Sequence, residues 1–312
     1  LGLVVRLIVT DTQLPTLVLQ ADISEATVDR VVMSDGQISA ELIKVDDQWM
    51  VGPYPVVEWK LDGFWEAVGK LPKANLIASN PDNHVVMGVS PFNGTAVEFV
   101  SNDVLLDRLI LGHREFIVQG GYNASPWTRQ VQLCYVRREG ANEVFGIYCP
   151  LPDQFFPHPY AWADPLIASM PRTEIATITY TYPDTEFKLI RESADWTLEG
   201  GGETVDAQLG AVYDLRAALE FLVTSDFPDE DIRDTLDFNY PDASLLVEFE
   251  DSAELEPVLL LFLNEVGGGY HVKDASKPYS YVLNQADAAG VVLQRQEFEP
   301  LPTATPESTA TP

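Results

Sequence analysis

A short stretch near the start of the chain alternates between apolar and polar residues, as strands do when they bury one face. Val31 and Met33 mark the first of two such strands, and Ala40 and Leu42 mark the second. The segment between them, residues 34–37, reads Ser-Asp-Gly-Gln, and these residue types are typical of a tight turn. The pattern therefore predicts a β-hairpin.

A helical pattern follows the hairpin. Apolar residues recur at steps of three or four, as they do along one face of an α-helix: Leu61, Phe64, Trp65, Val68 and Leu71. Such a face must be buried against another element. We therefore predict an amphipathic helix that packs on the sheet.

The sequence pattern of this hairpin and helix occurs a second time in the chain. Three further pairs match without a gap when Val31 is laid over Ile178: Leu42 with Leu189, Lys44 with Arg191, and Trp49 with Trp196. A slightly different shift lays the helix over residues 205–215, with Thr204 as its expected cap. Val97-Glu98-Phe99 also returns as Val247-Glu248-Phe249. We predict an α+β protein of two tandem homologous lobes, each an antiparallel sheet packed on an amphipathic helix.

The duplication divides the chain into five predicted parts. In order these are an N-terminal stub or anchor remnant (1–21), a first repeat lobe (22–150), a connector rich in proline and aromatic residues (151–172), a second repeat lobe (173–296) and a disordered Pro/Thr-rich tail (297–312). Residues 1–10 are apolar but shorter than the roughly 20 residues that span a bilayer. They are either the outer end of a membrane anchor or a β-strand. The connector's rings are expected to seal the joint between the lobes.

Trp49 and Trp196 end the second strand of each copy. A large ring in that place can fill the space between a sheet and a helix. We predict that both are packing residues.

The two cysteines of the chain lie on either side of a second predicted hairpin. If Ala141 and Asn142 form its turn, Cys134 faces Cys149 and Val136 faces Ile147. Directly opposed strand residues have Cα atoms about 4.5 to 5.5 Å apart, within the range that a disulfide accepts. We predict a disulfide, and with it an oxidising compartment outside the cytoplasm. Two buried free thiols are the alternative.

The charge of the chain restricts its partners. It carries 48 acidic and 19 basic residues, a formal net charge of −29, and the acidic residues are spread along its length. Nucleic acids and anionic lipid headgroups are bound by clustered Lys and Arg. The composition therefore excludes nucleic acid as a partner and leaves the membrane accessible only through an anchor.

Residues that could perform chemistry are scattered. The four histidines, His84, His113, His158 and His271, share no metal-ligand spacing, and an acidic cluster between Asp226 and Asp234 lacks the pattern of a calcium loop. We predict no cofactor, no metal and no catalytic residue. An enzyme would need a pocket where His113 or His158 meets carboxylates from another segment.

The best candidate for binding is the long link between residues 113 and 130, which the second copy makes in a handful of residues. Extended loops on a repeated scaffold often carry specificity. Tyr122, Asn123 and Trp127 lie in this loop, and their amphipathic rings and amide are suited to protein or sugar surfaces. A self-packed loop without a binding role is the alternative.

The order of these motifs resembles a bacterial extracytoplasmic family, domain of unknown function 4340. The resemblance covers about residues 22 to 295 and rests on three motifs in each copy: Gln48-Trp49, Ala67-Val68-Gly69-Lys70-Leu71 and Tyr135-Val136-Arg137-Arg138-Glu139-Gly140, then Asp195-Trp196, Ala211-Val212-Tyr213-Asp214-Leu215 and Tyr270-His271-Val272-Lys273. It implies tandem copies outside the membrane, an N-terminal anchor and, in some members, an ABC transporter of the gliding-motility type encoded nearby. It supplies no catalytic residues.

We therefore expect a non-catalytic, membrane-tethered extracytoplasmic interaction or scaffold module of a transport or cell-envelope complex, with envelope or transporter membrane proteins as partners. The alternative is an extracytoplasmic protein that binds a glycan or peptide through Tyr122, Trp127 or the connector aromatics.

Overall fold

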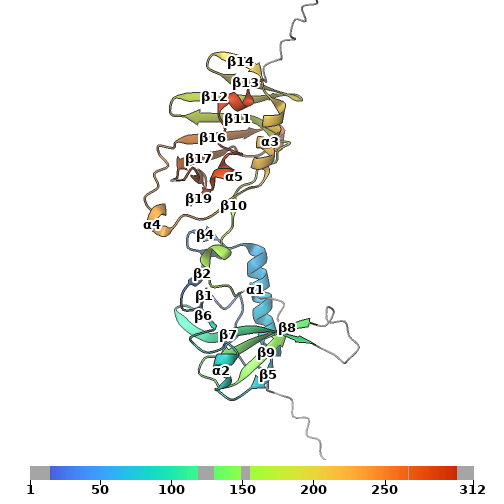
Figure 1. Cartoon of the computed structure of the whole chain (residues 1–312), viewed down its shortest axis with the longest axis vertical. Coiled ribbons are helices and arrows are strands. Elements are labelled where there is room, and N and C mark those ends of the chain that lie inside the picture. Colours follow the sequence, from blue (N-terminus) through green and yellow to red (C-terminus); the bar gives the residue numbers. More distant parts are fainter. Residues whose placement is uncertain (1–14, 119–129, 149–154, 266, 301–312) are drawn as a thin grey trace, which may run out of the picture. The chain divides into compact units, whose positions relative to one another are not determined.

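A computed structural model describes residues 15–118, 130–148, 155–265 and 267–300 of the chain. The chain forms two compact units, Leu1–Asp164 and Pro165–Pro312. Each unit contains its own large antiparallel sheet and a few helices (Figure 1). The predicted α+β class is confirmed.

The first unit contains a nine-stranded sheet in the order β4-β3-β2-β1-β6-β7-β8-β9-β5. Its elements are β1 (Arg30–Ser34), β2 (Ser39–Val45), β3 (Gln48–Val51), β4 (Tyr54–Pro55), α1 (Glu58–Lys70), η1 (Leu71–Lys73), β5 (Asn75–Ala78), α2 (Asn83–Val86), β6 (Thr95–Ser101), β7 (Val104–Val118), β8 (Gln130–Arg138), β9 (Val144–Tyr148) and η2 (Pro159–Ala161).

The second unit contains an eight-stranded sheet in the order β14-β13-β12-β11-β16-β17-β18-β19 and a small sheet of β10 and β15. Its elements are β10 (Leu166–Ala168), β11 (Ile175–Tyr182), β12 (Thr185–Glu192), β13 (Asp195–Gly200), β14 (Glu203–Asp206), α3 (Leu209–Glu220), β15 (Leu222–Val223), α4 (Glu230–Arg233), β16 (Ala243–Phe249), η3 (Asp251–Ala253), β17 (Val258–Asn264), β18 (Tyr270–Asp274), β19 (Tyr281–Leu283), α5 (Gln285–Ala288) and η4 (Arg295–Phe298).

The first hairpin forms as its alternating pattern predicts. Val31 pairs with Leu42 and Met33 pairs with Ala40, and all four side chains are fully buried. The turn is held by the carboxylate of Asp35, which accepts hydrogen bonds from two backbone N–H groups of the turn. Those bonds favour the charged carboxylate and lower the pKa of Asp35. Local sequence alone is therefore enough to specify this element.

Helix α1 buries the predicted apolar face against the sheet. Phe64, Ala67 and Val68 are its buried residues, and the ring of Phe64 lies 6.2 Å from that of Phe99 on β6. The helix runs beside the sheet strands of its own unit (Figure 1). The pattern of steps of three and four residues located this helix correctly.

The helix of the second repeat was predicted too early in the chain. Helix α3 is capped by Gln208, and Thr204 lies within strand β14 rather than at a helix cap. The reason is the turn between β13 and β14, where Gly201 and Gly202 have φ angles of 62° and 85°. This turn allows Val205 to pair with Leu198, so the residues expected to begin the helix extend the sheet instead.

The two large sheets repeat one arrangement of paired residues. Val31 pairs with Leu42 and Phe99 in the first unit, just as Ile178 pairs with Leu189 and Val247 in the second. The sequence match had placed Phe99 over Phe249, and the strand pairing corrects this. The strand order β4-β3-β2-β1-β6-β7-β8-β9 returns as β14-β13-β12-β11-β16-β17-β18-β19.

Each unit is closed by an aromatic residue that meets the start of its helix. The carbonyl of Trp162 accepts a hydrogen bond of 2.9 Å from the N–H of Val57, the residue that caps α1. The carbonyl of Phe298 accepts one of 2.9 Å from the N–H of Gln208, which caps α3. Both rings are buried. The two segments therefore do the same structural task in the two units.

This closure changes the interpretation of the connector and the tail. Trp162 was expected to seal a joint between lobes, but its ring lies 5.8 Å from Phe64 in the core of the first unit. Phe298 was assigned to a disordered tail, but it is fully buried between Tyr180 and Phe187. The described residues of these segments form only short elements, η2 and β10 in the connector and η4 at the start of the tail, and their proline content does not prevent their aromatic residues from packing.

Candidate functional site

The loop that the sequence favoured for binding is not among the described residues. Tyr122, Asn123 and Trp127 fall within residues 119–129, outside the part of the chain that the structure describes. Their role in binding therefore stays a prediction.

Trp49 and Trp196 occupy equivalent positions and are both buried, with 3% of each side chain exposed. Trp49 pairs with Lys44 across the strands, and Trp196 pairs with Arg191. The backbone carbonyl of each accepts a hydrogen bond from the residue that leads into the helix, at 2.9 Å from Val56 N–H and 2.8 Å from Ala207 N–H. This placement fits the expected packing role.

The helix residue that meets each indole differs between the units. Trp65 of α1 lies 5.7 Å from Trp49, whereas the guanidinium of Arg216 of α3 lies 5.3 Å from Trp196. Trp65 and Arg216 stand at the same position relative to the helix caps. Burial, together with the nearby charges of Arg191 and Arg172, lowers the pKa of Arg216. An aromatic pair in one unit is thus replaced by a cation–π pair in the other.

The predicted register of the cysteine hairpin is wrong. Cys134 pairs with Ile147, and Val136 pairs with Phe145. The turn forms earlier in the chain than expected, because the N–H of Ala141 donates to the carbonyl of Arg138 at 3.1 Å and Gly140 has a φ angle of 77°. Cys149 lies outside the described residues, so the disulfide between Cys134 and Cys149 stays a prediction.

Arg137 and Arg138, which belong to one of the motifs of the family resemblance, make contacts within the first unit. The guanidinium of Arg137 is buried and donates to the carbonyls of Val89 at 2.8 Å and Ala141 at 3.0 Å. Arg138 lies 3.2 Å from the buried carboxylate of Asp107. Buried charges need such partners. These contacts give both arginines a structural role.

The described histidines do not converge. The Nε2 atom of His84 lies 2.9 Å from the carbonyl oxygen of Asn142, His158 lies between the rings of Phe156 and Tyr160, and His271 is buried in β18. The side chain of His113 is outside the described part. Within the described ranges, no group of three or more His, Cys, Asp or Glu side chains could hold a metal ion.

The connector aromatics divide between core and surface. Trp162 is buried, and Phe155 packs on Phe64 with ring centroids 5.1 Å apart. Phe156 is the more accessible ring, at 46% exposed. An open aromatic strip for a glycan would need these rings at the surface together. The described rings therefore give this alternative little support.

An exposed apolar surface lies elsewhere in the first unit, at residues that no sequence motif singled out. Ile43 and Val45 on β2 are 41% and 51% exposed, and Met50 on β3 is half-buried beside them. Trp49 faces α1, so its neighbour Met50 must point to the opposite face of the sheet. We call Ile43, Val45 and Met50 the outer strip.

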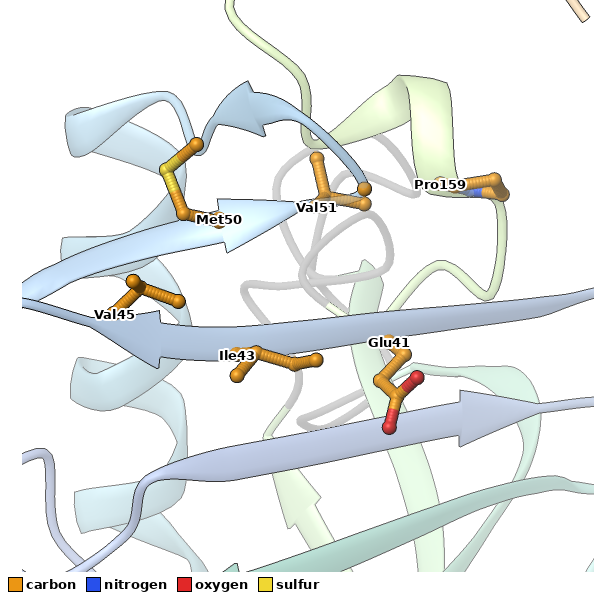
Figure 2. A pocket seen from close by; sticks show the side chains of 7 residues that line it. Glu41, Ile43, Val45, Met50, Val51 and Pro159 are labelled. Atoms are coloured by element: carbon orange, nitrogen blue, oxygen red, sulfur yellow. The ribbon is translucent and has the colours of Figure 1, made fainter. Parts of the chain in front are cut away.

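The outer strip lines a shallow hollow of about 400 Å³. Figure 2 shows Ile43 and Val45 on one strand, Met50 on the next, and Pro159 of η2 across from them. Val51, Gly52 and Glu41 complete its lining. The lining is mainly apolar, and its one charged member is Glu41. This hollow can hold an apolar side chain, but it provides no acid–base pair for catalysis.

The fold itself does not require this apolar strip. In the second unit, Ile190 pairs with Thr197 as Ile43 pairs with Met50. Val45 pairs with Gln48, and its counterpart Glu192 pairs with Asp195. The equivalent residues of the second unit are therefore Ile190, Glu192 and Thr197. Two of the three apolar positions are polar there, although the strands and register are the same.

The charges at the ends of the strip also differ between the units. Glu41 precedes the strip and Asp46 follows it, and both are exposed. Their counterparts on β12 and in the turn after it are Lys188 and Ser193. Glu41 lies 3.5 Å from Arg30, but an exposed pair of this kind is weakly held. Along the chain, the apolar residues of β2 in the first unit therefore lie between two acidic residues.

The chain gives no match to protein-family models, to curated proteins or to solved structures. None of the described helices has the length and apolar character needed to cross a membrane.

Proposed function

We propose that the chain is a non-catalytic interaction module that works outside the cytoplasm as part of a transport or cell-envelope complex. Its partners are envelope or transporter membrane proteins, and it contacts them through the outer strip of the first unit. The compartment and the class of complex follow from the resemblance to domain of unknown function 4340. The geometry of the outer strip supports the choice of docking surface.

The observation that carries this proposal is the contrast between the two units. Val45 and Met50 are apolar on an open sheet face where Glu192 and Thr197 stand in the second unit. Single exposed apolar residues are common on monomeric proteins, whereas a contiguous apolar patch is typical of an interaction surface. The second unit shows that a polar version of this face folds. The apolar version is therefore best explained by a partner.

Importing residues of the second unit into the outer strip should remove binding without unfolding the protein. We expect Val45→Glu, alone or with Met50→Thr, to lower co-purification of the native membrane partners by about tenfold or more, since a charge must then be desolvated in the interface. Quantitative mass spectrometry after cross-linking in native membranes measures this effect.

Val223→Glu is the matched control, because Val223 is 49% exposed, close to the 51% of Val45, and lies on β15 of the second unit. We expect this variant to retain its partners. Equal capture by the wild type and the Val45→Glu variant, with both folded, would contradict the proposed surface.

A further inference from the structure

The charges around the outer strip indicate what kind of segment it binds. We infer that its occupant is a short extended segment of the partner protein, apolar on one face and carrying a basic residue at each end. This inference rests on the proposed function and adds the chemistry of the partner. It is drawn from the direction of the strip, its length and the two exposed acidic residues, Glu41 and Asp46, that flank it along the chain.

The strip follows strand β2 and is therefore a straight, narrow surface. Glu41, Ile43 and Val45 share one face because alternate residues of a strand point the same way. At about 3.4 Å per residue, the span from Glu41 to Asp46 is roughly 17 Å. An extended segment of about five residues covers that distance, and its alternate side chains can meet the alternate residues of the strip.

Both ends of the strip are acidic. The side chain of Glu41 is 47% exposed, so it can turn from Arg30 to a stronger partner. At the other end, Asp46 and Asp47 lie in an exposed turn with φ angles of 49° and 67°, and Asp47 is fully exposed while lying 3.8 Å from Lys44. The surrounding protein carries a net charge of −29. Lysine or arginine beside the apolar face of the occupant would be complementary to these groups.

The same charge argues against a second copy of this chain as the occupant. Two chains of −29 repel each other, and a strip paired with its own copy would bring Glu41 and Asp46 of both chains to one interface. The second unit offers no better counterpart, because Lys188 there is accompanied by Glu192 on the same face. A segment of another protein that has basic residues at both ends is complementary to the acidic and apolar residues of the outer strip.

Two labelled peptides test this inference on the full chain. They share the centre Thr-Val-Thr-Val-Thr, and one is flanked by Lys-Lys at each end while the other is flanked by Glu-Glu. We expect fluorescence anisotropy to show at least about tenfold tighter binding of the lysine-flanked peptide at low salt, and a smaller difference at high salt because salt screens exposed charges. The Val45→Glu variant should lose binding of both peptides.

The variant Glu41→Lys with Asp46→Ser places the end residues of the second unit on the first. We expect it to bind the two peptides within about twofold of each other. Equal affinity of both peptides for the wild type, or no binding of either, would overturn the inference. So would a dimer of the wild type that Val45→Glu dissociates in sedimentation analysis, since the occupant would then be a second copy. The capture of native partners tests the proposed function separately, and its result does not depend on these peptides.

Discussion

Replacing Phe298 with alanine is expected to lower the free energy of unfolding of the second unit by about 3–5 kcal/mol, the usual cost of removing a buried phenylalanine ring. The ring is fully buried and lies 6.1 Å from Tyr180 and 5.9 Å from Phe187. Hydrogen exchange measured by mass spectrometry should show faster exchange in β11, β12 and α3. Backbone amides of the first unit should exchange as slowly as they do in the wild type.

Phe221→Ala is the control for this variant, since Phe221 belongs to the same unit but is 68% exposed. It should change stability by no more than about 0.5 kcal/mol. A Phe298→Ala protein with wild-type exchange throughout β11 and α3 would show that the closing segment is not part of the fold.

Trp162→Ala is expected to have the same effect on the first unit, with a loss of about 3–5 kcal/mol. The indole N–H donates to the carbonyl of Phe156 at 2.8 Å, and the ring packs edge-on against Phe64 of α1. Removing the ring leaves a cavity beside the helix and an unpaired carbonyl. Exchange should therefore increase in α1 and β4.

Phe156→Ala serves as the control, because the ring of Phe156 is 46% exposed while its backbone carbonyl, which the indole uses, remains in place. Destabilisation of the second unit by Trp162→Ala, with the first unit unaffected, would contradict the assignment of this segment to the first unit.

Local patterns predicted the elements whose stability is local. The hairpin through Asp35 and helix α1 could be located because a turn residue and an apolar stripe each specify one structure. The helix α3 could not be located as well, since Val205 fits a helical stripe and a strand equally. Only the glycine turn at Gly201 decides between them. The predicted register of the cysteine hairpin failed for a similar reason, because the turn closes at Gly140, which has a φ angle of 77°, rather than at Ala141 and Asn142.

The closing segments were missed because their structure depends on long-range packing. The proline content of the connector argued against a helix or central strand, and the described part of the connector has only the short η2 and β10. Nothing in the local pattern shows that Trp162 and Phe298 reach the caps of α1 and α3. The equivalence of the two segments becomes clear only from the hydrogen bond that each makes to the residue that caps the helix in its own unit.

The outer strip left a weak signal in the sequence. Leu42 and Ile43 are consecutive apolar residues on β2, so one of them must face away from the core. Leu189 and Ile190 form the same residue pair in the second unit, so these two positions do not show that the outer faces of the two units differ. The difference lies at Val45 and its counterpart, and assigning that position to a face required the observed register.

We infer that one arrangement of strands occurs twice and that only the first copy binds a partner through its outer face. Ile43 and Ile190 are the same residue at equivalent positions, so a photo-cross-linking amino acid placed at either one tests the claim with the scaffold held constant. In native membranes, we expect a cross-linked partner from position 43 and none from position 190. Equal adducts from both positions, or an adduct from position 190 alone, would contradict it.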